Sequence, residues 1–109
     1  MRAAILAVAA TVIVCAIGLT AGERAKPKMH TVTMENMRFQ PETLTVARGD
    51  TIVWINKDLV PHTATSKAGG FDSQVIQAEK SWRFTVRKKG DFAYRCTLHP
   101  TMTAMLRVR

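Results

Sequence analysis

The chain has 109 residues, which is room for one folded domain and excludes a multidomain enzyme. Sixteen Lys and Arg residues stand against eight Asp and Glu residues, giving a formal net charge of +8 at pH 7. The sequence shows no recognition helix and no motif that combines aromatic with basic residues, so we expect no nucleic-acid partner. The charge then indicates a solvated basic face, or attraction to an acidic partner protein or an anionic membrane surface.

Residues 1–22 are typical of a signal peptide. Arg2 is followed by an uncharged, apolar run from Ala3 to Ala21, and Thr20-Ala21-Gly22 offers small residues for cleavage. The alternative is an uncleaved anchor, because about 18 apolar residues suffice to span a bilayer. Basic residues after the run disfavour the anchor, since positive charge tends to stay on the inner side. We predict an exported, periplasmic protein that meets a membrane only through this segment, if the segment is retained.

Residues 23–30, with Pro27, are predicted to be a flexible lead-in to the domain. Met29 and His30 close this segment. They offer a weak second metal site as an alternative, but simple packing is the favoured interpretation because both residue types also suit it.

Residues 31–109 show short β signals punctuated by turn residues, and no amphipathic helix. The pattern predicts an all-β, antiparallel sandwich of about seven or eight strands. The expected strands are Thr31–Met34, Thr43–Val46, Thr51–Ile55, His62–Ser66, Ser81–Val86, Phe92–Cys96 and a last strand from Ala104. Met34 and Met37 are assigned to the core near the first strand.

The mature part contains one cysteine, Cys96, so an internal disulfide is impossible and the thiol needs another explanation. Cys96 is followed by His99 and Met102 at Cys-x2-His-x2-Met spacing, and His62 lies on a different predicted strand. One thiolate, two imidazoles and a thioether form the donor set that copper prefers in a trigonal site with a weak axial sulfur. Pro100 stiffens the loop by fixing a backbone torsion.

Each of these residues has an ordinary alternative when taken singly. Cys96 could be an inert core thiol, His62 a loop histidine and Met102 a core residue. Zinc is the competing metal, but structural zinc sites tend to use paired cysteines at Cys-x2-Cys spacing, which is absent here. The combination therefore indicates copper.

These motifs resemble those of the type 1 (blue) copper proteins, the cupredoxins of the plastocyanin/azurin superfamily. The loop from Cys96 to Met102 is most similar to that of the amicyanins, and Met34–Phe39 and Val60–Thr63 support the resemblance. The resemblance implies that the sandwich has the cupredoxin-like Greek-key topology. It also implies equatorial ligation by His62, Cys96 and His99, with Met102 as the axial ligand. It also implies that Asn56 braces the ligand loop near the cysteine. Leu98 stands where amicyanins have proline, so the family's amine dehydrogenase partner is not carried over.

The function implied is the transfer of single electrons through one copper ion that cycles between Cu(I) and Cu(II), without enzymatic activity. In the family, electrons pass through the exposed edge of the C-terminal histidine, here His99. Apolar neighbours would form the docking patch: Leu59, Val60, Pro61, Leu98 and Pro100. The partners would be transient redox proteins, acidic ones given the charge, and the protein a monomer. The alternative is a periplasmic copper carrier or storage protein.

Basic residues cluster late in the sequence, around Lys88 and Lys89. We expect these charges to speed association with an acidic redox partner at low salt.

Overall fold

The computed structural model describes residues 3–4, 7, 9–13 and 26–109. The predicted cleavage site at Thr20-Ala21-Gly22 lies outside these residues. Among the residues described, no helix has the length and apolarity needed to cross a bilayer. Nine strands make up the domain: β1 (Met29–Glu35), β2 (Arg38–Gln40), β3 (Thr43–Val46), β4 (Thr51–Asn56), β5 (Thr65–Ser66), β6 (Phe71–Asp72), β7 (Ser81–Thr85), β8 (Gly90–Arg95) and β9 (Thr103–Val108).

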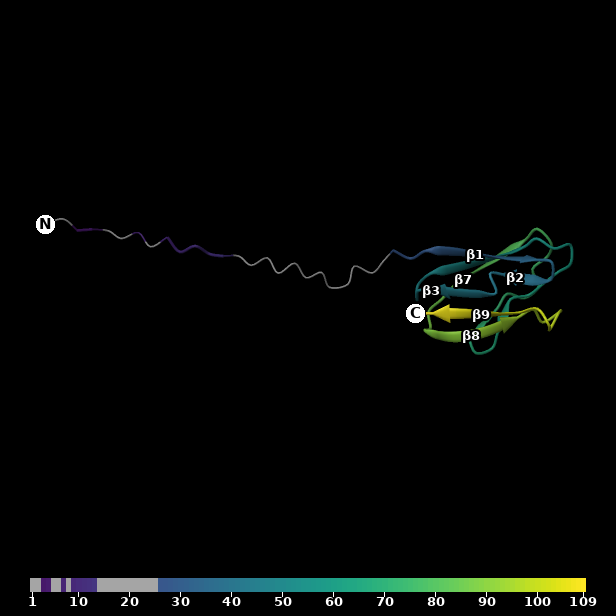
Figure 1. Ribbon diagram of the computed structural model, residues 1–109. Coiled ribbons are helices and arrows are strands. Elements are labelled where there is room, and N and C mark those ends of the chain that lie inside the picture. Colours follow the sequence, from purple (N-terminus) through teal and green to yellow (C-terminus); the bar gives the residue numbers. More distant parts are fainter. Residues whose placement is uncertain (1–2, 5–6, 8, 14–25) are drawn as a thin grey trace.

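The strands form two sheets, which confirms the predicted all-β sandwich (Figure 1). One sheet has the order β2-β1-β4-β7, and the other has the order β3-β9-β8-β5-β6. The hairpin of β8 and β9 is antiparallel, with Phe92 opposite Leu106, and β4 pairs antiparallel with β7.

Two of the strand pairings are parallel, so both sheets are mixed. The prediction of an antiparallel sandwich is therefore wrong for these two pairings. β1 lies parallel to β4, and β3 lies parallel to β9. The physical reason is the crossing of the chain between layers. Because β3 belongs to the other sheet, the chain leaves the first sheet after β2 and returns as β4 in the direction of β1.

Alternating side chains from the two sheets form one core. Leu106 and Val108 on β9 are buried while Arg107 between them is exposed, as period-two strands require. Aromatic rings fill the centre, with Trp54 lying 5.5 Å from Phe71 and 5.7 Å from Tyr94 between ring centroids. Burial raises the pKa of Tyr94 to about 12.

The nine strands exceed the seven or eight predicted, because the sequence pattern does not predict β2 and β6, and several other boundaries shift by one or two residues. Two differences stand out. β1 begins at Met29, so the last two residues of the predicted lead-in are already paired with β4. The expected strand from His62 to Ser66 is reduced to Thr65–Ser66, and His62 forms only an isolated bridge with Ile76. Because His62 lies outside the regular strands, its side chain is not confined to either face of the sheet and can face a site at the sheet's end.

The sandwich has two distinct ends (Figure 1). The chain enters β1 and leaves β9 at one end, which we call the entry end. The connection from β8 to β9, residues 96–102, lies at the other, which we call the loop end.

Candidate metal centre

His62 is delivered by the loop that follows β4. Its backbone amide donates to the Ile76 carbonyl at 3.1 Å and its carbonyl accepts from the Ile76 amide at 2.7 Å, which fixes the backbone at both polar groups. The side chain is fully buried. A histidine held in this way cannot turn to solvent, so its ring nitrogens must find partners inside the protein.

The second part of the site is the loop between β8 and β9, which hydrogen bonds close into a tight ring. The Cys96 amide donates to the Met102 carbonyl at 3.0 Å, and the Met102 amide donates to the His99 carbonyl at 2.8 Å. The strand β8 ends at Arg95, so the sheet delivers Cys96 directly into this loop. The predicted tight loop is therefore present.

Three donor atoms from these two segments converge. The Cys96 Sγ lies 3.8 Å from His62 Nδ1 and 3.6 Å from His99 Nδ1, and the two Nδ1 atoms lie 3.2 Å apart. In the part of the chain that the structure describes, one group of donor side chains lies close enough together to hold a metal ion. It consists of His62, Cys96 and His99. Residues 34 positions apart in sequence thus meet at one point.

The thiol is oriented by a neighbouring backbone group. The Thr63 amide donates to Cys96 Sγ at 3.3 Å, and Thr63 Oγ1 accepts from the Thr97 amide at 2.9 Å. These contacts join the His62 segment to the Cys96 loop. The N–H directed at sulfur thus helps to fix the position of the sulfur atom beside the His62 segment.

Asp58 is a functional residue that the sequence analysis missed. Its Oδ2 accepts from His62 Nε2 at 2.7 Å, and the carboxylate also accepts from the backbone amides of Asn36 and Met37. Desolvation raises the pKa of Asp58, but the hydrogen bonds from Met37, His62 and Asn36 together outweigh it and lower that pKa below its ordinary value. A carboxylate on Nε2 places the proton there and leaves the Nδ1 lone pair free for a metal.

Asn56 has a bracing role, though at a different place from the one implied by resemblance. Its Nδ2 donates to the carbonyls of Val60 and Ile76, both at 2.9 Å, and its Oδ1 accepts from the Asp58 amide at 2.9 Å. These contacts hold the loop before His62 and not the loop after Cys96.

Met102 is buried immediately before β9, within the closed loop. Met105 lies three residues further along, paired with Ala93 and Thr43 in the middle of the sheet. At about 3.3 Å per residue this is roughly 10 Å farther from the loop. Met102 is therefore the thioether positioned near the three converging donors.

Apolar side chains surround the loop end. Apart from Met29, every exposed large apolar residue in the range 26–109 lies there: Met37, Leu59, Val60, Val75 and Leu98. Leu59 is 95% exposed and Leu98 is 46% exposed. Met37 lies in this patch and not in the core, because the turn at residues 36–37 turns it outward while its amide binds Asp58. Val75 also joins the patch, since it precedes Ile76, the partner of His62.

The second copper site considered at Met29 and His30 gains no support. His30 Nε2 is bonded to Asp50 Oδ2 at 2.9 Å, and Met29 is exposed. Adjacent residues of a strand point to opposite faces, so the two side chains do not converge.

Comparison with known proteins supports the same type of site. A family model described as a cupredoxin-like domain matches residues 4–108. Amicyanin of Paracoccus denitrificans is 30% identical over 76 residues, covering 65% of this chain and 58% of that protein. Amicyanin-alpha of Methylorubrum extorquens is 28% identical over 105 residues, covering 92% of this chain and 88% of that protein. The chain thus spans somewhat less than two thirds of the Paracoccus relatives that it matches.

Solved structures give the same picture. The Cu(I) form of an amicyanin mutant superposes with a TM-score of 0.69 at 27% identity, covering 80% of this chain and 87% of that chain. A copper-containing nitrite reductase from Thermus scotoductus superposes with a TM-score of 0.71 at 26% identity, but only 24% of that chain is covered.

Proposed function

Because the chain belongs to the cupredoxin-like domain family, we propose that it is a blue copper protein that shuttles single electrons between redox partners. One copper ion would be held by His62, Cys96 and His99 as equatorial ligands, with Met102 as the axial ligand. The convergence of one thiol sulfur and two imidazole nitrogens within 4.8 Å carries this proposal. Copper bound there would supply one-electron chemistry by alternating between Cu(I) and Cu(II).

The donor set fits copper better than zinc. The cluster holds a single sulfur with two imidazoles, and the buried Met102 lies in the same closed loop. Soft sulfur donors together with imidazole suit copper, whereas structural zinc sites tend to use several cysteines.

The protein part of the mechanism is to keep the donors in one arrangement in both redox states. His62 is held by Asp58 and Ile76, and Cys96 by the Thr63 amide and the closed loop. Because the protein's own groups make these contacts, they would hold the donors in place in either oxidation state of a bound copper ion. A rigid frame of this kind favours fast electron transfer.

Electrons would enter and leave at His99. His62 and Cys96 are fully buried, whereas His99 is partly exposed and lies beside the exposed Leu98. The apolar patch would let a partner approach the His99 edge in a small, transient encounter. We propose that such partners are redox proteins and that the carrier works as a monomer.

A copper carrier or storage role is the second possibility, but the burial of the donors argues against it. A carrier needs donors that an accepting protein can reach, and Cys96, His62 and Met102 are all buried. We also propose that the chain is not itself an enzyme. The match to nitrite reductase covers a minor part of that protein, so its activity does not extend to this chain.

We further propose a periplasmic location. The apolar run from Ala3 to Ala21, after Arg2, supports export.

Titration with Cu(II) tests the proposed function. The intact protein should bind one equivalent and develop an intense visible band from charge transfer between the Cys96 thiolate and copper. Cys96→Ser should abolish the band while the far-ultraviolet circular dichroism still reports a β fold. A colourless Cu(II) complex of the intact protein would refute the proposal.

A further inference from the structure

The charges of the domain are segregated between its two ends. Basic residues gather at the entry end: Lys26, Lys28, Arg48, Arg87, Lys88, Lys89, Arg107 and Arg109. Acidic residues there are Asp50 and Asp91. The loop end is close to balanced, with Arg38, Lys57, Lys80 and Arg95 against Glu35, Asp58 and Glu79. The net positive charge of the domain therefore belongs mainly to the end remote from the metal centre.

Much of this charge lines one groove. It has a volume of about 910 Å³ and lies where the start of β1, the turn before β4 and the end of β9 meet. The basic residues lining it are Lys26, Lys28, His30, Arg48, Arg87, Lys89 and Arg109.

Asp50 is the acidic residue among the groove's lining residues, and its carboxylate oxygens already accept hydrogen bonds from the protein itself. Its carboxylate accepts from the backbone amides of Lys28 and Ala47 and from His30 Nε2. It is buried, whereas Lys28, Arg48 and Lys89 are exposed. The groove thus presents cations to solvent while its one carboxylate faces inward.

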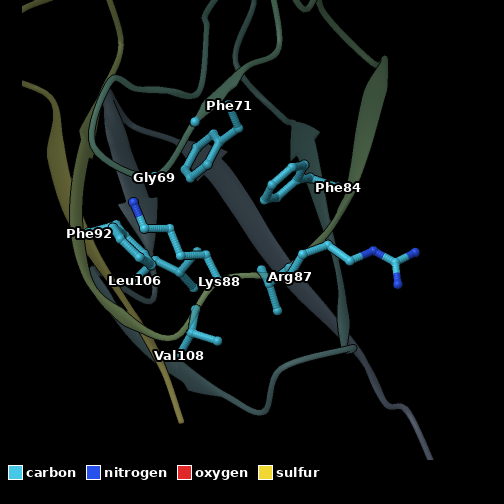
Figure 2. A pocket seen from close by; sticks show the side chains of 10 residues that line it. Gly69, Phe71, Phe84, Arg87, Lys88, Phe92, Leu106 and Val108 are labelled. Atoms are coloured by element: carbon cyan, nitrogen blue, oxygen red, sulfur yellow. The ribbon is translucent and has the colours of Figure 1, made fainter.

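Arg87 and Lys88 border a second, apolar cavity of about 270 Å³ next to the groove (Figure 2). The Lys88 Nζ lies 5.6 Å from the centre of the Phe92 ring, and Arg87 extends its guanidinium group away from the labelled phenyl rings. Arg109 pairs with Asp91 at 2.8 Å. Lys28, Arg48 and Lys89 are therefore the residues whose charge can be changed with least effect on packing or pairing.

The distance between the ends separates this charge from redox docking. β8 leads from the entry end to the metal loop, and its six residues span roughly 20 Å at about 3.3 Å each. The Debye length is about 10 Å at 0.1 M salt, so the basic groove acts weakly on a partner that approaches His99. A redox partner seated in the groove would be too far from His99 for efficient electron tunnelling.

We propose that the entry end is a docking surface for an anionic phospholipid bilayer. Three loops that contribute the charges form one broad cationic end, which suits many headgroup phosphates better than one small anion. The apolar segment from Ala3 to Ala21 also precedes Lys26 in the sequence, and Lys26 lines the groove at this end. Docking there directs His99 and the apolar patch away from the lipid, toward soluble redox partners.

Vesicle binding tests the proposal, using copper-loaded protein recovered from the exported fraction. At low ionic strength it should sediment with phosphatidylglycerol vesicles and not with phosphatidylcholine vesicles. The combined change Lys28→Glu, Arg48→Glu and Lys89→Glu should weaken binding on the order of a hundredfold. The matched control Arg38→Glu, Lys57→Glu and Lys80→Glu changes the net charge equally at the loop end and should alter binding by less than about threefold.

Equal losses in both triple variants would mean that net charge alone governs binding, and would overturn the proposal. So would failure of the parent protein to bind phosphatidylglycerol vesicles at low salt. Unchanged vesicle binding of the entry-end variant, together with slower reaction with an acidic redox protein, would assign the surface to proteins instead. If the glutamate variant does not fold, the glutamine version at the same positions should still weaken vesicle binding.

An electrode gives a second test, one of orientation. On a carboxylate-terminated monolayer the entry end should face the surface, so interfacial electron transfer should be slow. On a methyl-terminated monolayer the apolar patch should adsorb and transfer should be faster. Faster transfer on the carboxylate surface would contradict the proposed orientation.

Discussion

At the scale of single residues, the position of Met102 distinguishes it from Met105. It lies in the closed loop with Cys96 and His99, whereas Met105 lies in the middle of β9. Met102→Leu should raise the reduction potential of the copper-loaded protein, because axial ligand identity tunes such potentials. Met105→Leu should leave it nearly unchanged. Voltammetry of both variants decides the assignment, and a larger shift for Met105→Leu would refute it.

Asp58 gives a second prediction at this scale. Asp58→Asn removes the negative charge beside His62 Nε2 and weakens the bonds to the Asn36 and Met37 amides. Loss of that charge destabilises Cu(II) more than Cu(I), because Cu(II) carries the higher positive charge. The reduction potential should therefore rise. The free energy of unfolding should fall by about 1–2 kcal/mol.

Asp91→Asn is the matched control for Asp58→Asn. Asp91 is exposed and its carboxylate pairs with Arg109 at the entry end, away from the ligands. The two variants change the net charge equally. Equal potential shifts would show that the Asp58 contact with His62 has no particular effect.

At the scale of elements, Asp50 ties the start of β1 to the turn between β3 and β4. The hydrogen bonds from the Lys28 amide and His30 lower the pKa of Asp50 from 3.8 to about 2. Because the folded-state pKa lies below the unfolded value, the contact stabilises above about pH 4. That stabilisation, about 2 kcal/mol, is lost as the pH falls through about 2.

Asp50→Asn should therefore lower the free energy of unfolding of the metal-free protein at pH 7 by about that amount. It should also flatten the acid dependence of stability between about pH 4 and pH 2. Urea unfolding across this range measures both effects. Asp91→Asn, which breaks the exposed pair with Arg109, should change little. A pH profile identical to that of the parent would exclude this role for Asp50.

At the scale of the whole molecule, the exposed apolar residues and the basic groove lie at opposite ends. Leu98→Glu should slow electron transfer to a redox partner even at high salt, because it breaks the apolar contact beside His99. Met29→Glu introduces the same charge at the entry end and should have little effect on that rate. The second-order rate measured against ionic strength separates the two. Equal slowing by both variants would mean that the apolar patch does not form the contact.

The same arrangement changes the expected role of Lys88 and Lys89. Sequence position suggested that they steer an acidic redox partner, and the acidity of such a partner stays a prediction. The structure places both residues at the entry end, roughly the length of β8 from the metal loop. Their field is largely screened at His99 in physiological salt.

The sequence by itself determined the class of fold and the chemistry of the site. Alternation in segments such as Ser81–Val86 and Thr43–Val46 requires strands, because period two matches the pleat and not a helix. Cys96, His99 and Met102 could be identified because they are close in sequence within one loop. Donor type and short spacing are local properties, and both can be read without knowing how distant segments meet.

Only the tertiary structure decided what depends on contacts between distant segments. The parallel pairing of β1 with β4 requires knowing that β3 crosses to the other sheet. Asp58 could not be recognised as the partner of His62 Nε2 from its position alone, because a carboxylate four residues away contacts a side chain only if the loop turns back. The segregation of charge likewise depends on the fold, because the strands bring residues 26–28, 48 and 89 from distant parts of the sequence to one end of the sandwich. Through-space interactions follow the folded path of the chain and not sequence order.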